Sequence, residues 1–180
     1  KGREQSLFFY RIALSLMPEW LKADIEKNSL SVIDLGCAEG EGVNLFGEAF
    51  PSSRVCGSDI SAAALERAKK YYPDYDFIES DINNIPESFD VVFSSNTLEH
   101  FENPEGIIKN ILPHCKKYFV MLIPFREFDR IDEHFYTFDY NSFPDINDEF
   151  RLVYHKETDL RELEDTQWPG EEMLVVDMRK

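Results

Sequence analysis

From residue 32 the chain carries the sequence Val32-Ile33-Asp34-Leu35-Gly36-Cys37-Ala38-Glu39-Gly40. Its first four residues are three apolar side chains and one acid, which is typical of a buried parallel strand. The next five include Gly36, Ala38 and Gly40, small residues that let the backbone bend sharply and let a ligand approach it closely. A helical pattern begins at Glu41, so free N–H groups of a helix N-terminus follow the turn. This order of strand, turn and helix predicts the small-molecule site of an open α/β sheet.

Composition narrows the class of protein. A chain of 180 residues, 43% of them hydrophobic, has the length and the core of one domain. Its formal net charge of −16 repels phosphate backbones, so nucleic acid is not an expected partner. Neither an apolar run of the ~20 residues that a membrane span needs nor a signal-peptide pattern is present, so no membrane partner is expected. The three cysteines, Cys37, Cys56 and Cys115, lack metal-ligand spacing, which indicates a reducing, cytoplasmic location and predicts no metal ligands.

Helical and strand patterns alternate along the chain. Residues 4–27 have helical spacing, and Pro18 is expected to divide them into two helices. Further helices are expected over 41–50, 61–72 and 104–114, and strands over 31–35, 54–58, 75–79, 89–94 and 118–123, the last ended by Pro124. This alternation predicts a parallel sheet. The final strands, 152–155 and 173–178, have no long helix between them and predict an antiparallel hairpin at one edge.

Four successive strands are each expected to end in a polar residue: Asp34, Asp59, Asp81 and Asn96. Ligands of open α/β sheets bind at the carboxyl ends of the strands, so these side chains are expected to meet at one site. The carboxylate of Asp59 can accept hydrogen bonds from the two vicinal hydroxyls of a ribose. Its alternative role is that of an acid at the N-terminus of the next helix.

Three motifs carry a family resemblance. Asp34-x-Gly36-x-Ala38-x-Gly40 resembles motif I of class I S-adenosylmethionine-dependent methyltransferases, with Ala38 where that family usually has glycine. Asp81-Ile82 resembles the family's adenine-edge motif, and residues 89–100, which end in Leu-Glu-His, resemble its fourth motif in the small-molecule branch. The dinucleotide fingerprint G-x-G-x-x-G does not fit, because from Gly36 its later positions fall on Ala38 and Glu41. The resemblance covers residues 32–123.

The resemblance implies a fold, a cofactor and a set of binding residues. The expected fold class is α/β, a Rossmann-like three-layer sandwich with a mostly parallel seven-stranded sheet and an antiparallel edge hairpin. The implied cofactor is S-adenosylmethionine, whose cationic groups suit a stretch, residues 36–60, in which Arg54 is the single basic residue. The residues expected to bind it are Asp34, Gly36, Cys37, Ala38, Gly40, Asp59, Ile60, Asp81, Ile82 and Asn96.

Two histidines are candidates for the base that removes the hydroxyl proton when the methyl acceptor is an alcohol or a phenol. His100 follows the fourth strand and is the first choice, and His134 is the second; a purely structural role is the alternative for each. Residues 125–150 contain eight aromatic and eight acidic residues but two basic ones. In the family this region helps to shape the acceptor pocket, and its composition suits sugars, amines or hydroxylated rings. The alternative is that its aromatics are core and its acids solvated surface.

The expected function is therefore an S-adenosylmethionine-dependent methyltransferase, an enzyme that O-methylates a small-molecule or glycan-type acceptor by in-line transfer. The rivals are a non-catalytic cofactor-binding or interaction module and a nucleotide-dependent oxidoreductase. Residues 1–180 are expected to form one domain, and the sequence leaves open whether a longer chain contains it. This domain would comprise N-terminal helices (4–27) that either pack on the sheet or cover the site, a cofactor-binding core (31–123), an acceptor-shaping segment (124–150) and C-terminal strands (151–178). The oligomeric state is not specified.

Overall fold

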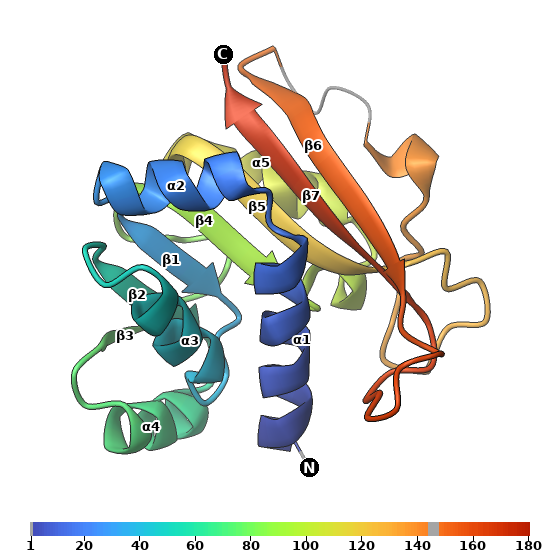
Figure 1. Ribbon diagram of the computed structural model, residues 1–180, viewed down its shortest axis with the longest axis horizontal. Coiled ribbons are helices and arrows are strands. Elements are labelled where there is room, and N and C mark those ends of the chain that lie inside the picture. The colour runs from blue at the N-terminus through green and yellow to red at the C-terminus, as the bar shows by residue number, and fades with distance from the viewer. Residues whose placement is uncertain (1, 144–147) are drawn as a thin grey trace.

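The computed structural model describes residues 2–143 and 148–180. Seven strands form one sheet in the order β3-β2-β1-β4-β5-β7-β6 (Figure 1). The strands are β1 (Val32–Leu35), β2 (Val55–Asp59), β3 (Asp76–Glu79), β4 (Phe89–Ser95), β5 (Cys115–Phe125), β6 (Phe150–Asp159) and β7 (Glu171–Arg179). The helices are α1 (Gly2–Leu16), α2 (Glu19–Lys27), α3 (Glu41–Ala49), α4 (Ala62–Tyr71) and α5 (Pro104–Ile111), with short 3₁₀ turns at Leu98–His100, Leu112–His114 and Tyr140–Ser142.

The sheet is parallel from β3 to β5 and antiparallel beyond. Strand β7 runs antiparallel to both β5 and β6, so the last two strands form a hairpin at the sheet edge. The predicted fold class, a mostly parallel seven-stranded sheet with an antiparallel edge hairpin, is confirmed. Because strand order reverses between β1 and β4, a crevice for a ligand is expected at the carboxyl ends of these two strands.

Two hydrophobic layers cover the two faces of the sheet. One packs the sheet against α1, α2, α3 and α4, and the other packs it against α5 and the segment around Phe138. Within β1, Val32 faces the first layer while Ile33 and Leu35 face the second. Burial on both faces explains why the central strands are almost continuously apolar.

Local signals in the sequence place most boundaries. Ser61 caps α4 by accepting a hydrogen bond from the backbone N–H of Ala64 (3.3 Å), and Pro18 lies between α1 and α2 as predicted. The expectation that Pro124 ends the fifth strand is wrong, because β5 continues through it to Phe125. Pairing with β4 ends at Leu122, so Pro124 pairs with β7 and has no partner in β4. A single bridge from Phe125 to Phe138 follows on that side, and a proline is tolerated where no neighbouring strand needs its N–H.

The helix expected to reach residue 114 ends as an α-helix at Ile111 and continues as a 3₁₀ turn. None of the helices in residues 2–143 and 148–180 is long and apolar enough to cross a membrane.

Candidate active site at the β1 turn

The turn after β1 has left-handed backbone conformations at three positions. Gly36 has φ +78°, Ala38 has φ +47° and Gly40 has φ +88°. A Cβ atom on Gly36 would lie 2.6 Å from Oγ1 of Thr97, so this position requires glycine for space as well as for conformation. Ala38 adopts the left-handed region at a cost of about 1–2 kcal/mol, which a glycine would avoid. The turn therefore forms as predicted, with a strained residue at its centre.

Hydrogen bonds hold this turn against β2. The N–H groups of Gly36 and Cys37 donate to the carbonyl of Ser58, at 2.8 and 3.0 Å. The carboxylate of Asp59 accepts from the N–H of Ala38 (2.9 Å) and from the N–H of Ser61 (2.8 Å). Asp59 thus joins the turn to the start of α4, and each of its oxygens keeps a free lone pair for a ligand.

A cavity of about 260 Å³ lies beyond the ends of β2 and β3, and we call it the β2–β3 cavity. It brings together five predicted cofactor residues, Gly36, Asp59, Ile60, Asp81 and Ile82. Ile60 is 72% exposed, which is unusual for an isoleucine and leaves its side chain free to contact a ligand. The complete lining is Leu35, Gly36, Ser58, Asp59, Ile60, Ser80, Asp81, Ile82, Thr97 and Phe101.

A second cavity of about 260 Å³ lies under α1, and we call it the α1 cavity. It contains both predicted histidines, and Gly36 lines it as well as the β2–β3 cavity. The complete lining is Gln5, Ser6, Phe9, Tyr10, Gly36, Ala38, Ser95, Asn96, Glu99, His100, Ile131, Glu133, His134 and Trp168. The glycine turn is therefore the place where the two cavities meet.

Helix α1 packs on the sheet, which is one of the two alternatives for the N-terminal helices, and its residues also line the α1 cavity. The hydroxyl of Tyr10 donates a hydrogen bond to Oδ2 of Asp34 (2.7 Å), and Arg3 pairs with the buried Glu41 (2.6 Å). The pKa of Asp34 is raised to about 7, chiefly by burial and also by the negative charge of Asp59, against the lowering effect of the hydrogen bond from Tyr10.

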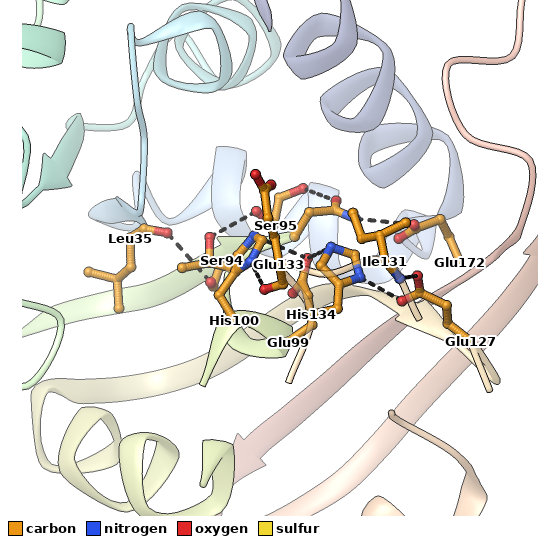
Figure 2. A network of polar contacts seen from close by, with 12 residues as sticks. Leu35, Ser94, Ser95, Glu99, His100, Glu127, Ile131, Glu133, His134 and Glu172 are labelled. Carbon is orange, nitrogen blue, oxygen red and sulfur yellow. Dashed lines mark hydrogen bonds and ion pairs between the residues drawn. The ribbon is translucent and has the colours of Figure 1, made fainter. Parts of the chain in front are cut away.

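His100 and His134 lie beside the buried Glu99 on the floor of the α1 cavity (Figure 2). Nδ1 of His100 lies 2.8 Å from the carbonyl oxygen of Glu133, and Nδ1 of His134 lies 2.5 Å from Oε2 of Glu127. Nε2 of each ring lies 3.9 Å from Oε1 of Glu99. Burial raises the pKa of Glu99 to about 8, and the charge of Glu127 acts in the same direction.

A second buried acid lies next to this cluster. Glu172 is fully buried on β7 and accepts a hydrogen bond from Nδ2 of Asn96 (3.1 Å), itself in the left-handed region with φ +46°. Burial raises the pKa of Glu172 well above its ordinary value, and the charge of Glu99 adds to this effect. The predicted residue Asn96 thus connects the α1 cavity to a carboxyl on a strand far along the chain.

Three predicted cofactor residues line neither cavity. Asp34 is fully buried and accepts a hydrogen bond from Tyr10. Cys37 is also buried, with its sulfur against Gly57, and Gly40 begins α3 behind the turn. These residues shape the turn.

The sequence did not single out Tyr10, Glu99 and Trp168, which line the α1 cavity, or Glu172, which bonds to Asn96 of that lining. The available signal was weak: an acid directly before His100 and a tyrosine on the apolar face of the first helix.

In the segment 125–150, Ile131, Glu133 and His134 line the cavity. Its aromatics divide between core (Phe125, Phe138) and exposed surface (Phe128, Phe135), and positions 144–147 lie outside the described residues.

A mostly parallel sheet with a glycine turn at the strand reversal and acids at the next two strand ends defines a Rossmann-like domain that binds an adenosyl-type ligand. The family model for the methyltransferase domain matches residues 26–167, and the chain belongs to this family. The prediction of a class I S-adenosylmethionine-dependent methyltransferase is confirmed.

Similar proteins include the trans-aconitate 2-methyltransferase of Escherichia coli, 33% identical over 97 residues. That match covers 46% of this chain and 38% of the relative, so it spans well under half of the curated protein. Among solved structures, the magnesium protoporphyrin IX methyltransferase of Synechocystis with bound S-adenosylmethionine has a TM-score of 0.72 at 17% identity, covering 97% of this chain and 79% of the other. The structure of a putative S-adenosylmethionine-dependent methyltransferase from Listeria monocytogenes has a TM-score of 0.70 at 18% identity, covering 100% of both chains.

Proposed function

We propose that this domain transfers the methyl group of S-adenosylmethionine to an uncharged or cationic small-molecule or glycan-type acceptor, with a hydroxyl oxygen as the first choice of nucleophile. The observation that carries the proposal is the meeting of two cavities at Gly36. A ligand with an adenosyl end and an amino-acid end can lie across this turn, with its sulfur between the cavities.

The β2–β3 cavity fits the adenosyl half of the cofactor. Asp59 offers one lone pair on each oxygen to the ribose hydroxyls, and Asp81 can accept from the adenine amino group. Ile60 and Ile82 supply apolar surface for the ring. When bound, the cofactor supplies a methyl group on a positively charged sulfur, and the acidic surroundings favour that charge.

The α1 cavity fits an acceptor that is not a polyanion. Its described lining contains the acids Glu99 and Glu133 but neither lysine nor arginine. Trans-aconitate, the compound in the name of the Escherichia coli relative, carries several carboxylates and would find no basic partner among these residues. Hydroxylated rings, sugars and amines suit the aromatic and acidic lining better.

The chain contributes alignment and proton removal. Holding the acceptor in line with the methyl group can supply about 7–11 kcal/mol of the barrier. As the acceptor O–C bond forms, the S–C bond breaks and the sulfur keeps its electron pair, while the hydroxyl proton moves to Nε2 of an imidazole. His100 is the first candidate for this proton acceptor and His134 the second, because both residues line the cavity and Nδ1 of each is already bonded, which leaves Nε2.

Incubation of the full chain with S-adenosylmethionine and a panel of acceptors, followed by mass spectrometry, tests the proposal. Methyl incorporation into hydroxylated or amine acceptors is expected, and exclusive labelling of nucleic acid or of polycarboxylates would overturn the acceptor class. Loss of turnover in His100→Ala at unchanged cofactor affinity supports its role, whereas equal turnover removes it. His155→Ala, an exposed histidine on β6, is the matched control.

Two further expectations remain proposals. Residues 1–180 act as one methyltransferase domain, with α1 as its cover and the segment 124–150 as part of the acceptor side. The free and buried cysteines, Cys37, Cys56 and Cys115, support a reducing, cytoplasmic location.

A further inference from the structure

Glu99, His100 and His134 direct electron pairs at one another on the floor of the α1 cavity. A backbone carbonyl and a carboxylate accept hydrogen bonds, so Nδ1 of each ring donates and Nε2 of each neutral ring carries a lone pair. Each Nε2 lies 3.9 Å from Oε1 of Glu99, which is too far for a hydrogen bond. Neither oxygen of Glu99 has a hydrogen-bond partner among the described residues. A cation placed between the two Nε2 atoms and Oε1 of Glu99 would accept an electron pair from each of the three groups.

We propose that Glu99, His100 and His134 bind one divalent transition-metal ion, of the kind of Zn²⁺, Co²⁺ or Mn²⁺. One ligand atom from each of these residues lies within 4.8 Å of the other two. Around a tetrahedral ion with bonds of about 2.0–2.2 Å, ligand atoms lie roughly 3.3–3.6 Å apart, so small side-chain rotations close the site. Two imidazoles and a carboxylate, with a fourth position open to a cavity, are a donor set of catalytic zinc sites, and they suit Mg²⁺ and Ca²⁺ less well.

The second layer of contacts supports this assignment. Metal-binding histidines usually donate their other ring N–H to a carboxylate or a backbone carbonyl, which fixes the tautomer and the ring direction. Here Glu127 holds His134 and the carbonyl of Glu133 holds His100 (Figure 2). Both rings are therefore fixed with Nε2 toward Glu99.

The burial of Glu99 is an independent observation that points to a ligand. Its side chain is fully buried, and an ionised carboxylate without a partner is costly in that environment. The described lining of the cavity holds no lysine or arginine to pair with it. A doubly charged cation would offset this carboxylate. The sequence predicted no metal ligands, and the inference departs from that expectation.

The role of the ion rests on the proposed function, whereas its binding does not. A cation at this point would lower the pKa of an acceptor hydroxyl, so that the proton leaves to water through the open cavity. His100 would then act as a ligand instead of the proton acceptor. Turnover that is lost on chelation and restored by one ion distinguishes the two roles.

Metal-free full chain without a polyhistidine tag, titrated with Co²⁺ and followed by visible absorption, tests the site directly. We expect saturation at one equivalent, displacement by Zn²⁺ and no competition from equal Mg²⁺. Glu99→Gln, His134→Ala and His100→Ala should each weaken Co²⁺ binding at least about tenfold, and Glu127→Gln about 10–100-fold through the orientation of His134. His155→Ala should bind Co²⁺ as the wild type does.

No saturable Co²⁺ binding by the wild type, or wild-type affinity in His100→Ala or Glu99→Gln, would overturn the proposal. The side chain of His100 is 41% exposed, so its replacement tests the site without emptying a core position. Titration of the same samples with S-adenosylhomocysteine reports on the proposed function separately. Retained cofactor binding without Co²⁺ binding overturns the metal site alone, and the reverse result overturns the cofactor assignment alone.

Discussion

The replacement Asp59→Asn tests how the cofactor is recognised. Each oxygen of Asp59 already accepts one backbone N–H, from Ala38 and from Ser61, and has room for one ribose hydroxyl. Asparagine keeps one carbonyl oxygen and replaces the other with an NH₂ group that cannot accept. One charge-assisted hydrogen bond to the ribose is lost, which is worth about 1.5–3 kcal/mol. The dissociation constant for S-adenosylhomocysteine should therefore rise about 10- to 150-fold.

The same replacement places an NH₂ group opposite a backbone N–H, so the free energy of unfolding should fall by about 1–3 kcal/mol. Calorimetric titration with S-adenosylhomocysteine and with its 2′,3′-dideoxy analogue separates the two effects. We expect the variant to bind the dideoxy analogue nearly as well as the wild type does. Equal weakening for both ligands would show that Asp59 acts through the turn alone, and unchanged affinity for the natural ligand would refute the ribose assignment. Asp74→Asn, an exposed acid after α4, is the control for the change in charge.

Three other substitutions test the turn and its cover. Tyr10→Phe removes the hydrogen bond to buried Asp34 and should lower the free energy of unfolding by about 1–3 kcal/mol in urea; an unchanged midpoint would contradict this. Gly36→Ala, with a left-handed backbone and a contact of 2.6 Å to Thr97, should weaken S-adenosylhomocysteine binding more than about tenfold, and wild-type affinity would contradict the close approach. The pKa of Asp34 is raised from 3.8 to about 7, so between these pH values the folded state holds a proton that the unfolded state loses. The contribution of this proton to the free energy of unfolding is complete below about pH 4 and is lost as the pH rises to about 7. Asp34→Asn should remove that part of the pH dependence, at most about 4 kcal/mol, and an identical slope in both proteins would count against the shift.

The strand-end residues could be predicted because parallel strands end at a common edge. Asp59 ends β2 and Asp81 follows β3, and strand alternation alone places them beside the glycine turn. The start of α4 could also be predicted from Ser61, because a capping side chain acts within one helical turn of its own position.

What could not be predicted depends on contacts between distant segments. Asp34 is hidden by Tyr10, 24 residues earlier, and no local pattern shows that α1 folds back over the turn. The position of Pro124 within β5 depends on where pairing with β4 ends. In the sequence Glu99 is only part of a motif, and its place beside two imidazoles depends on residues 133–136, which hydrogen-bond to Glu99 and His100.

The account depends on one ligand lying across Gly36 between the two cavities. A crystal structure of the full chain with S-adenosylhomocysteine tests this most directly. The expected complex has adenosine in the β2–β3 cavity, its ribose hydroxyls on Asp59, and its sulfur at Gly36 facing His100. Ligand bound elsewhere, or adenosine in the α1 cavity with Asp59 free of contact, would contradict it.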